Sequence, residues 1–144
     1  MSKELIGIAV DHGGFALKQS VSEEIRALGY DVLDLGTDSE ESVDYPDFAE
    51  KLVAAIRRGD ISRGVLICGT GIGISIAANR HVGMRAALCY DDDTACLARQ
   101  HNNANVICLG GRKTGSELAR TMVRLFLETE FEGGRHARRV GKMG

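Results

Sequence analysis

The segment GVLICGTGIGISIAAN, residues 64–79, places a thiol directly before a cluster of glycines. Cys68 ends an apolar run typical of a buried strand, and a helix is expected at residues 74–79. The turn between them holds Gly69, Gly71 and Gly73. Backbone N–H groups in such a turn favour a thiolate and can stabilise a developing oxyanion. Cys68 is therefore either a base or nucleophile or, as the alternative, a packed core cysteine.

The glycine turn does not match the common nucleotide-binding motifs. A third glycine of G-x-G-x-x-G is absent, and the turn follows the third expected strand rather than the first. No stretch reads G-x-x-x-x-G-K-[ST]. NAD and ATP are disfavoured as cofactors, whereas a small anion or an enediolate suits a bare helix N-terminus. Thr70 is either a turn residue or a hydroxyl beside the oxyanion.

Short apolar runs alternate with amphipathic segments along the chain. The expected strands are residues 5–10, 31–35, 65–68, 85–89 and 105–109. Helices are expected between them and after the last strand. This alternation predicts one doubly wound, Rossmann-like α/β domain over residues 1–144, with a five-stranded parallel sheet and a C-terminal helical tail from about residue 131.

Two helix starts carry capping signals. Asp91, with the two aspartates that follow it, is expected to cap the fourth helix. The sequence TGSE from Thr114 reads as a capping box for the fifth, whose inward residues should be Leu118, Met122 and Leu125.

Polar and glycine residues follow each expected strand. In a parallel sheet these positions share one edge, which is where ligands bind. The edge should collect Asp11, His12, Gly36, Thr37, Cys68, Tyr90, Gly110, Gly111 and Arg112. The sequence therefore predicts the site at this carboxyl edge.

His101 falls between the fourth helix and the fifth strand, at the opposite edge of the sheet from Cys68. Five strand residues at about 3.3 Å each separate the two by roughly 15 Å. A catalytic His101 must therefore serve the site of a neighbouring chain. The alternative is a surface histidine near a helix end.

The tail carries Arg135 and Arg139, four residues apart. A helix would place both guanidinium groups on one face, as a phosphate clamp. A solvated tail or a weak RNA patch explains the same composition.

Composition is that of an ordinary soluble globular protein of 144 residues, with a net charge of −2. This charge gives no case for binding nucleic acid or an anionic membrane. We expect a cytoplasmic protein, because no segment resembles a signal peptide or a membrane helix. The cysteines Cys89, Cys96 and Cys108 fit buried free thiols, and no Cys/His spacing matches a zinc site.

Several motifs together resemble the type B branch of the ribose/galactose isomerase family. They are DHGG from Asp11, DYP from Asp44, CGTGIGIS from Cys68, RQHN from Arg99, and EGGRH from Glu132. The resemblance covers residue 6 to about residue 140, and the set is very specific.

The resemblance implies interconversion of ribose 5-phosphate and ribulose 5-phosphate through a cis-enediolate, without a metal or other cofactor. Cys68 would be the base, His101 the ring-opening acid/base, and Thr70 an enediolate partner. One branch of the family uses a glutamate that falls at Ile74 here, which leaves Cys68 as the base. Substrate contacts would come from Asp11, His12, Tyr45, Gly69, Thr70, Gly71, Ile72, Gly73, Asn102, Arg112, Arg135 and Arg139. The implied assembly is a homodimer, or a tetramer, with sites shared between subunits.

Other functions remain open at this point. The same chemistry could act on a 6-phosphate hexose such as allose or galactose 6-phosphate. A sugar-phosphate-binding regulator would bind without turnover. A phosphoacceptor signalling module needs an aspartate at the end of the third strand, where Cys68 stands.

Overall fold

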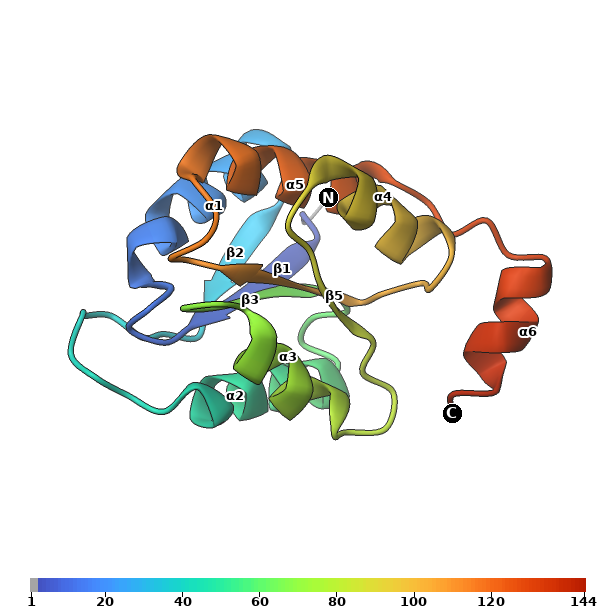
Figure 1. Ribbon diagram of the computed structural model, residues 1–144, viewed down its shortest axis with the longest axis horizontal. Helices are drawn as coiled ribbons and strands as arrows, with labels where there is room; N and C mark the ends of the chain where they lie inside the picture. The colour runs from blue at the N-terminus through green and yellow to red at the C-terminus, as the bar shows by residue number, and fades with distance from the viewer. Residues whose placement is uncertain (1–2) are drawn as a thin grey trace.

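The computed structural model describes residues 3–144, and within them a parallel sheet of five strands forms the centre (Figure 1). Neighbouring strands are parallel throughout, in the order β2-β1-β3-β5-β4. The strands are β1 (Leu5–Val10), β2 (Asp31–Asp34), β3 (Gly64–Cys68), β4 (Ala86–Leu88) and β5 (Val106–Gly110). The predicted α/β class and parallel sheet are confirmed.

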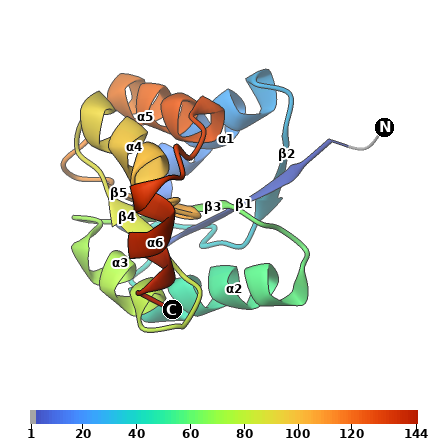
Figure 2. The same ribbon diagram turned by 90° about the vertical axis from the view of Figure 1, so that its right-hand side faces the viewer.

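Helices cover both faces of this sheet. They are α1 (Phe15–Ala27), α2 (Tyr45–Arg58), α3 (Ile72–Asn79), α4 (Asp92–Gln100), α5 (Ser116–Glu128) and α6 (Arg135–Gly141). One layer contains α1, α4 and α5, and the other contains α2 and α3 (Figure 1). The domain is therefore doubly wound. Helix α6 belongs to neither layer and runs across one side of the molecule, from the level of α4 to that of α3 (Figure 2).

The central strand β3 separates two apolar cores. Val65 and Ile67 face the core under α1, α4 and α5, whereas Leu66 and Cys68 face the core under α2 and α3. Every residue of β3 is buried, as expected for a strand covered on both faces. The strand that ends in Cys68 is therefore enclosed on both faces, as is its neighbour β5.

Local sequence explains two of the helix ends. Gly59 ends α2 with φ of 83°, a conformation that glycine adopts without strain. The Asp91 carboxylate caps α4 by accepting the N–H of Thr94 at 2.8 Å, which confirms the predicted cap. Among residues 3–144, no helix is both long and apolar enough to cross a membrane.

Two predicted details are wrong, and a third is confirmed only in part. The capping box at Thr114 does not form, because Gly115 is the N-cap residue of α5 and no side chain caps this helix. The predicted inward face of α5 is confirmed at Met122, which is fully buried, and at Leu118, which packs against the core. Leu125 is only partly buried, whereas its neighbours Val123 and Phe126 are fully buried. Helix α3 begins at Ile72, two residues before the predicted start at residue 74, since Gly71 already provides the N-cap conformation.

Candidate active site

At the carboxyl end of β3, the connections that follow neighbouring strands leave toward opposite faces of the sheet. Helix α3 leaves β3 toward one face of the sheet, whereas α1 and α5 leave the neighbouring strands β1 and β5 toward the other. Loops that diverge in this way open a crevice beyond the strand ends, where ligands of parallel sheets bind. Cys68 stands at this point, paired with Gly110 of β5.

The thiol of Cys68 is held by the turn that follows it. Its Sγ accepts a hydrogen bond from the N–H of Gly71 at 3.2 Å, and the residue is 4% exposed. Gly71 has φ of 80°, a left-handed conformation that glycine adopts without strain. The hydroxyl of Thr70 accepts the N–H of Ile72 at 3.1 Å. A hydrogen bond donated to sulfur stabilises a thiolate more than a thiol, so this turn can support a base.

Other buried thiols lack this support. Burial raises the pKa of Cys89 to about 11 and that of Cys108 well above its ordinary value. All four cysteines are free, as the sequence predicts, and Cys96 is partly buried. Cys89 and Cys108 are thus neutral core residues at physiological pH.

The loop after β1 is fitted closely against the glycine turn. Asp11, 5% exposed, accepts the N–H groups of Gly13 at 2.8 Å and Gly14 at 3.2 Å through Oδ1. A Cβ added at Gly13 would lie 2.8 Å from the backbone nitrogen of Gly69, so only glycine permits this approach. Nδ1 of His12 accepts the N–H of Val43 at 3.1 Å, which fixes the imidazole at this edge.

Arg112 and Tyr45 lie on either side of the turn. A Cβ added at Gly69 would meet Nη1 of Arg112 at 2.9 Å, and one added at Gly73 would meet the ring of Tyr45 at 2.6 Å. The structure therefore gathers the predicted residues Asp11, His12, Tyr45, Cys68, Thr70 and Arg112 with the glycine turn at one edge.

Tyr90 is an additional member of this edge to which the sequence gave no role. Its hydroxyl donates to the carbonyl oxygen of Thr70 at 2.7 Å and so supports the turn from the β4 side. The signal that could have found it is its place directly after a strand, among the other edge residues.

His101 lies at the other end of the molecule. It is the C-cap residue of α4, and its ring stacks on that of His136 with centroids 4.2 Å apart and planes 10° from parallel. Oε1 of Glu132 lies 3.9 Å from Nε2 of His101 and 3.7 Å from Nε2 of His136. Desolvation lowers the pKa of His136, and the neighbouring His101 and Arg135 lower it further.

The role of His136 and Glu132 was missed from sequence, although their i, i+4 spacing was a signal. With His101 they offer ligand atoms within 4.8 Å of one another. The two imidazole planes are nearly parallel, and their ring centroids lie 4.2 Å apart.

The remaining predicted substrate-binding side chains lie on the same side of the molecule as His101. Arg135 and Arg139 lie exposed on α6, and Asn102 follows His101. Asn102 also lines a groove of about 450 Å³ at the start of β4 and β5, together with Val140 and Met143 near the end of the chain. The structure of one chain does not bring His101, Asn102 or the two arginines to Cys68.

A parallel α/β domain with an amide-supported thiol and an arginine at its carboxyl edge defines a class of protein that binds small anionic ligands. Comparison with known proteins narrows this class. The sequence profile described as Ribose/Galactose Isomerase matches residues 6–143, and the chain belongs to this family.

Individual relatives are similar over nearly their whole lengths. Ribose-5-phosphate isomerase B of Escherichia coli strain K12 is 45% identical over 135 residues, which are 94% of this chain and 91% of that protein. The structure of ribose-5-phosphate isomerase B from Clostridium thermocellum has a TM-score of 0.95 at 51% identity, covering 97% of this chain and 95% of the other. A ribose 5-phosphate isomerase from Thermotoga maritima has a TM-score of 0.94 at 54% identity, covering 97% of each chain.

Proposed function

We propose that this protein is a ribose-5-phosphate isomerase that interconverts ribose 5-phosphate and ribulose 5-phosphate. The observation that carries the proposal is the Gly71 N–H donated to Cys68 Sγ, at the edge that also holds Asp11 and Arg112. The extended similarity to ribose-5-phosphate isomerases supports the choice of substrate.

In the proposed reaction, Cys68 acts as the base on an open-chain sugar. Its thiolate removes the proton on C2, and the electron pair moves to O1 to give a cis-enediolate. N–H groups of the glycine turn and the hydroxyl of Thr70 stabilise the negative oxygen. The proton is returned to C1 while the O2 proton passes to O1, which gives the ketose. A positioned base of this kind contributes about 10²–10⁴ in rate.

Ring opening must precede this step, and we assign it to His101. A proton leaves the hydroxyl on C1, the bond between C1 and O4 breaks, and a proton is delivered to O4. One imidazole can perform both transfers, because it presents an acceptor nitrogen and a donor N–H. Arg135 and Arg139 would hold the phosphate.

The location of these groups supports a site shared between two chains. His101, Asn102 and the arginines lie at the edge opposite Cys68, so in this proposal they complete the site of a neighbouring subunit. The tail from about residue 131, including α6, would accordingly pack on that partner. The proposal is thus a homodimer, or a tetramer built from such dimers.

The activity test measures ketose formation from ribose 5-phosphate, with and without a chelator. Cys68→Ala should abolish turnover, and full activity in that variant refutes the mechanism. Mixing inactive Cys68→Ala and His101→Ala chains should restore activity at hybrid sites. If subunits exchange and activity does not return, the shared site is refuted.

A 6-phosphate hexose is the second candidate substrate, because the matching family is described as covering ribose and galactose isomerases. The ratio of kcat/KM for ribose 5-phosphate to that for allose or galactose 6-phosphate decides between them. Binding of sugar phosphate without any turnover would instead indicate a regulator.

A further inference from the structure

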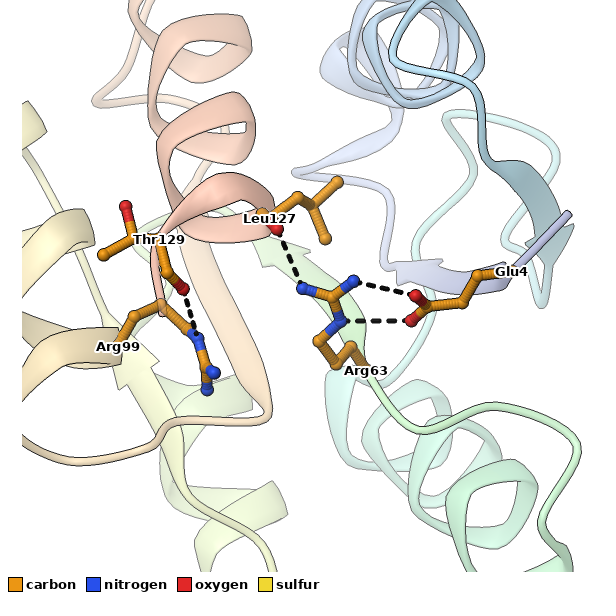
Figure 3. Close-up of polar contacts among 5 residues, drawn as sticks. All are labelled: Glu4, Arg63, Arg99, Leu127 and Thr129. Carbon is orange, nitrogen blue, oxygen red and sulfur yellow. Dashed lines mark hydrogen bonds and ion pairs between the residues drawn. The ribbon is translucent and has the colours of Figure 1, made fainter. Parts of the chain in front are cut away.

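The last turn of α4 is hydrogen-bonded to the segment that connects α5 to α6. Nε of Arg99 donates to the carbonyl oxygen of Thr129 at 3.2 Å (Figure 3). The carbonyl oxygen of the next residue, Gln100, accepts the N–H of Glu132 at 3.1 Å. The segment that leads into α6 is therefore fixed to the helix that ends in the proposed ring-opening histidine.

Arg99 is itself firmly placed. Its Nη1 donates to Oδ1 of Asn103 at 3.0 Å and to the carbonyl oxygen of Ala104 at 2.6 Å. Arg63 anchors the end of α5 beside it, with Nη1 donating to the carbonyl oxygen of Leu127 at 3.0 Å (Figure 3). Two arginines thus secure both sides of the junction between α5 and the tail.

The stack of His101 on His136 is a further contact between the end of α4 and the tail. The side chain of His101 is 41% exposed, whereas that of His136 is 9% exposed. An exposed imidazole at a helix end would otherwise sample several rotamers. Because the buried ring of His136 lies parallel to it at 4.2 Å, the ring of His101 has a defined plane.

Charged and titratable groups surround the stacked ring of His136. The groups facing His136 are His101, Glu132, Arg135 and Arg139, and the lowered pKa of His136 keeps this buried ring neutral near pH 7. His101 is the more exposed member of the stacked pair and is therefore the ring that a substrate can reach.

We infer that His136 is a positioning residue for ring opening, and that it acts by holding the imidazole plane of His101 through the stack. The inference rests on the proposed function. His136 takes no proton from the sugar in this account. Its contribution is to orient the acceptor and donor nitrogens of His101 toward the C1 hydroxyl and O4 during the ring-opening step described above.

The test compares His136→Ala, which removes the stack, with His136→Phe, which keeps a planar ring without nitrogens. On ribose 5-phosphate we expect kcat of the alanine variant to fall about 10- to 100-fold, since misorientation of a catalytic group costs rates of this order. The KM should stay within about threefold, because both phosphate-binding arginines remain. The phenylalanine variant should recover most of kcat.

A second readout separates ring opening from proton abstraction. Ribulose 5-phosphate is acyclic, so deuterium from D₂O can enter C1 through Cys68 without any ring chemistry. NMR should show the alanine variant exchanging the C1 hydrogen of ribulose 5-phosphate at a rate similar to wild type, while it turns over cyclic ribose 5-phosphate slowly. Arg138→Ala, which removes an exposed side chain from the same helix, is the matched control and should leave both rates unchanged.

Three results would overturn the inference. They are a kcat for His136→Ala within twofold of wild type, an equal loss in the alanine and phenylalanine variants, and a loss of C1 exchange in parallel with turnover. An inactive wild-type protein would instead refute the proposed function, and the two failures are thereby distinguished.

Discussion

Gly71 offers a sharp test of how the glycine turn supports Cys68. Its φ is 80°, and an added Cβ would lie 2.6 Å from Cδ1 of Leu88 and 2.9 Å from the carbonyl carbon of Leu109. The substitution Gly71→Ala therefore imposes two costs. A left-handed conformation costs about 1–2 kcal/mol for alanine, and overpacking against a fixed neighbour costs about 1–3 kcal/mol.

The effect on activity follows from the hydrogen bond between Gly71 N–H and Cys68 Sγ, which is 3.2 Å long. Relief of the overlap must move the turn and lengthen this bond. Hydrogen bonds to charged groups contribute about 1.5–3 kcal/mol. Loss of the bond should lower kcat about 10- to 100-fold, at about 1.4 kcal/mol for each factor of ten.

Gly29→Ala is the matched control, because Gly29 has φ of 96° and an added Cβ would have no heavy atom within 4 Å. It should cost only the conformational term and leave kcat unchanged. Urea unfolding at equal protein concentration gives the free energies, and steady-state assay of ribose 5-phosphate gives kcat. If Gly71→Ala is no less stable than Gly29→Ala, or retains full kcat, the account of the turn is wrong.

Three further predictions concern other parts of the fold. The Asn79 side chain donates to the carbonyl oxygen of Ala86 and accepts the N–H of the same residue, each at 2.8 Å. Asn79→Ala should therefore lower the free energy of unfolding by about 1–3 kcal/mol, and a change under about 0.5 kcal/mol in urea unfolding would contradict this. Burial raises the pKa of Cys89 to about 11, so at pH 8 this thiol should be alkylated about 100-fold more slowly than a thiol of pKa 9.0. Mass spectrometry should show the labelling rate rising with pH up to about 11, and rapid labelling at pH 8 would contradict the raised pKa. Asp91→Ala should lower the urea midpoint more at pH 7 than at pH 2. Capping hydrogen bonds lower the pKa of Asp91 in the folded state, so the carboxylate stabilises the fold above its unfolded-state pKa, and this stabilisation is lost as the pH falls through its folded-state pKa. An equal loss at both pH values would exclude a charged cap.

Much of the fold was predictable because its signals are local. The apolar run of β3 is buried on both faces, and such runs identify central strands without any knowledge of their partners. The strand order could not be read in the same way. It places β5 between β3 and β4, which depends on how helices pack on the two faces rather than on any one segment.

The site was predictable to the extent that strand ends share an edge. Cys68, Asp11 and Arg112 follow their strands directly, so the parallel sheet alone brings them together. Contacts between distant segments were not predictable from spacing. Tyr90 reaches Thr70 across the strand order, and His136 meets His101 only because the tail turns back onto α4.

The separation of Cys68 from His101 within one chain has a consequence for refolding. Under the shared-site proposal, the sheet and the helices that cover it involve one chain only and can form in a first-order process. A working site forms only when two chains meet. After dilution from denaturant, helical structure should return at a rate independent of protein concentration. Enzymatic activity should lag behind it, and the lag should shorten as the concentration rises.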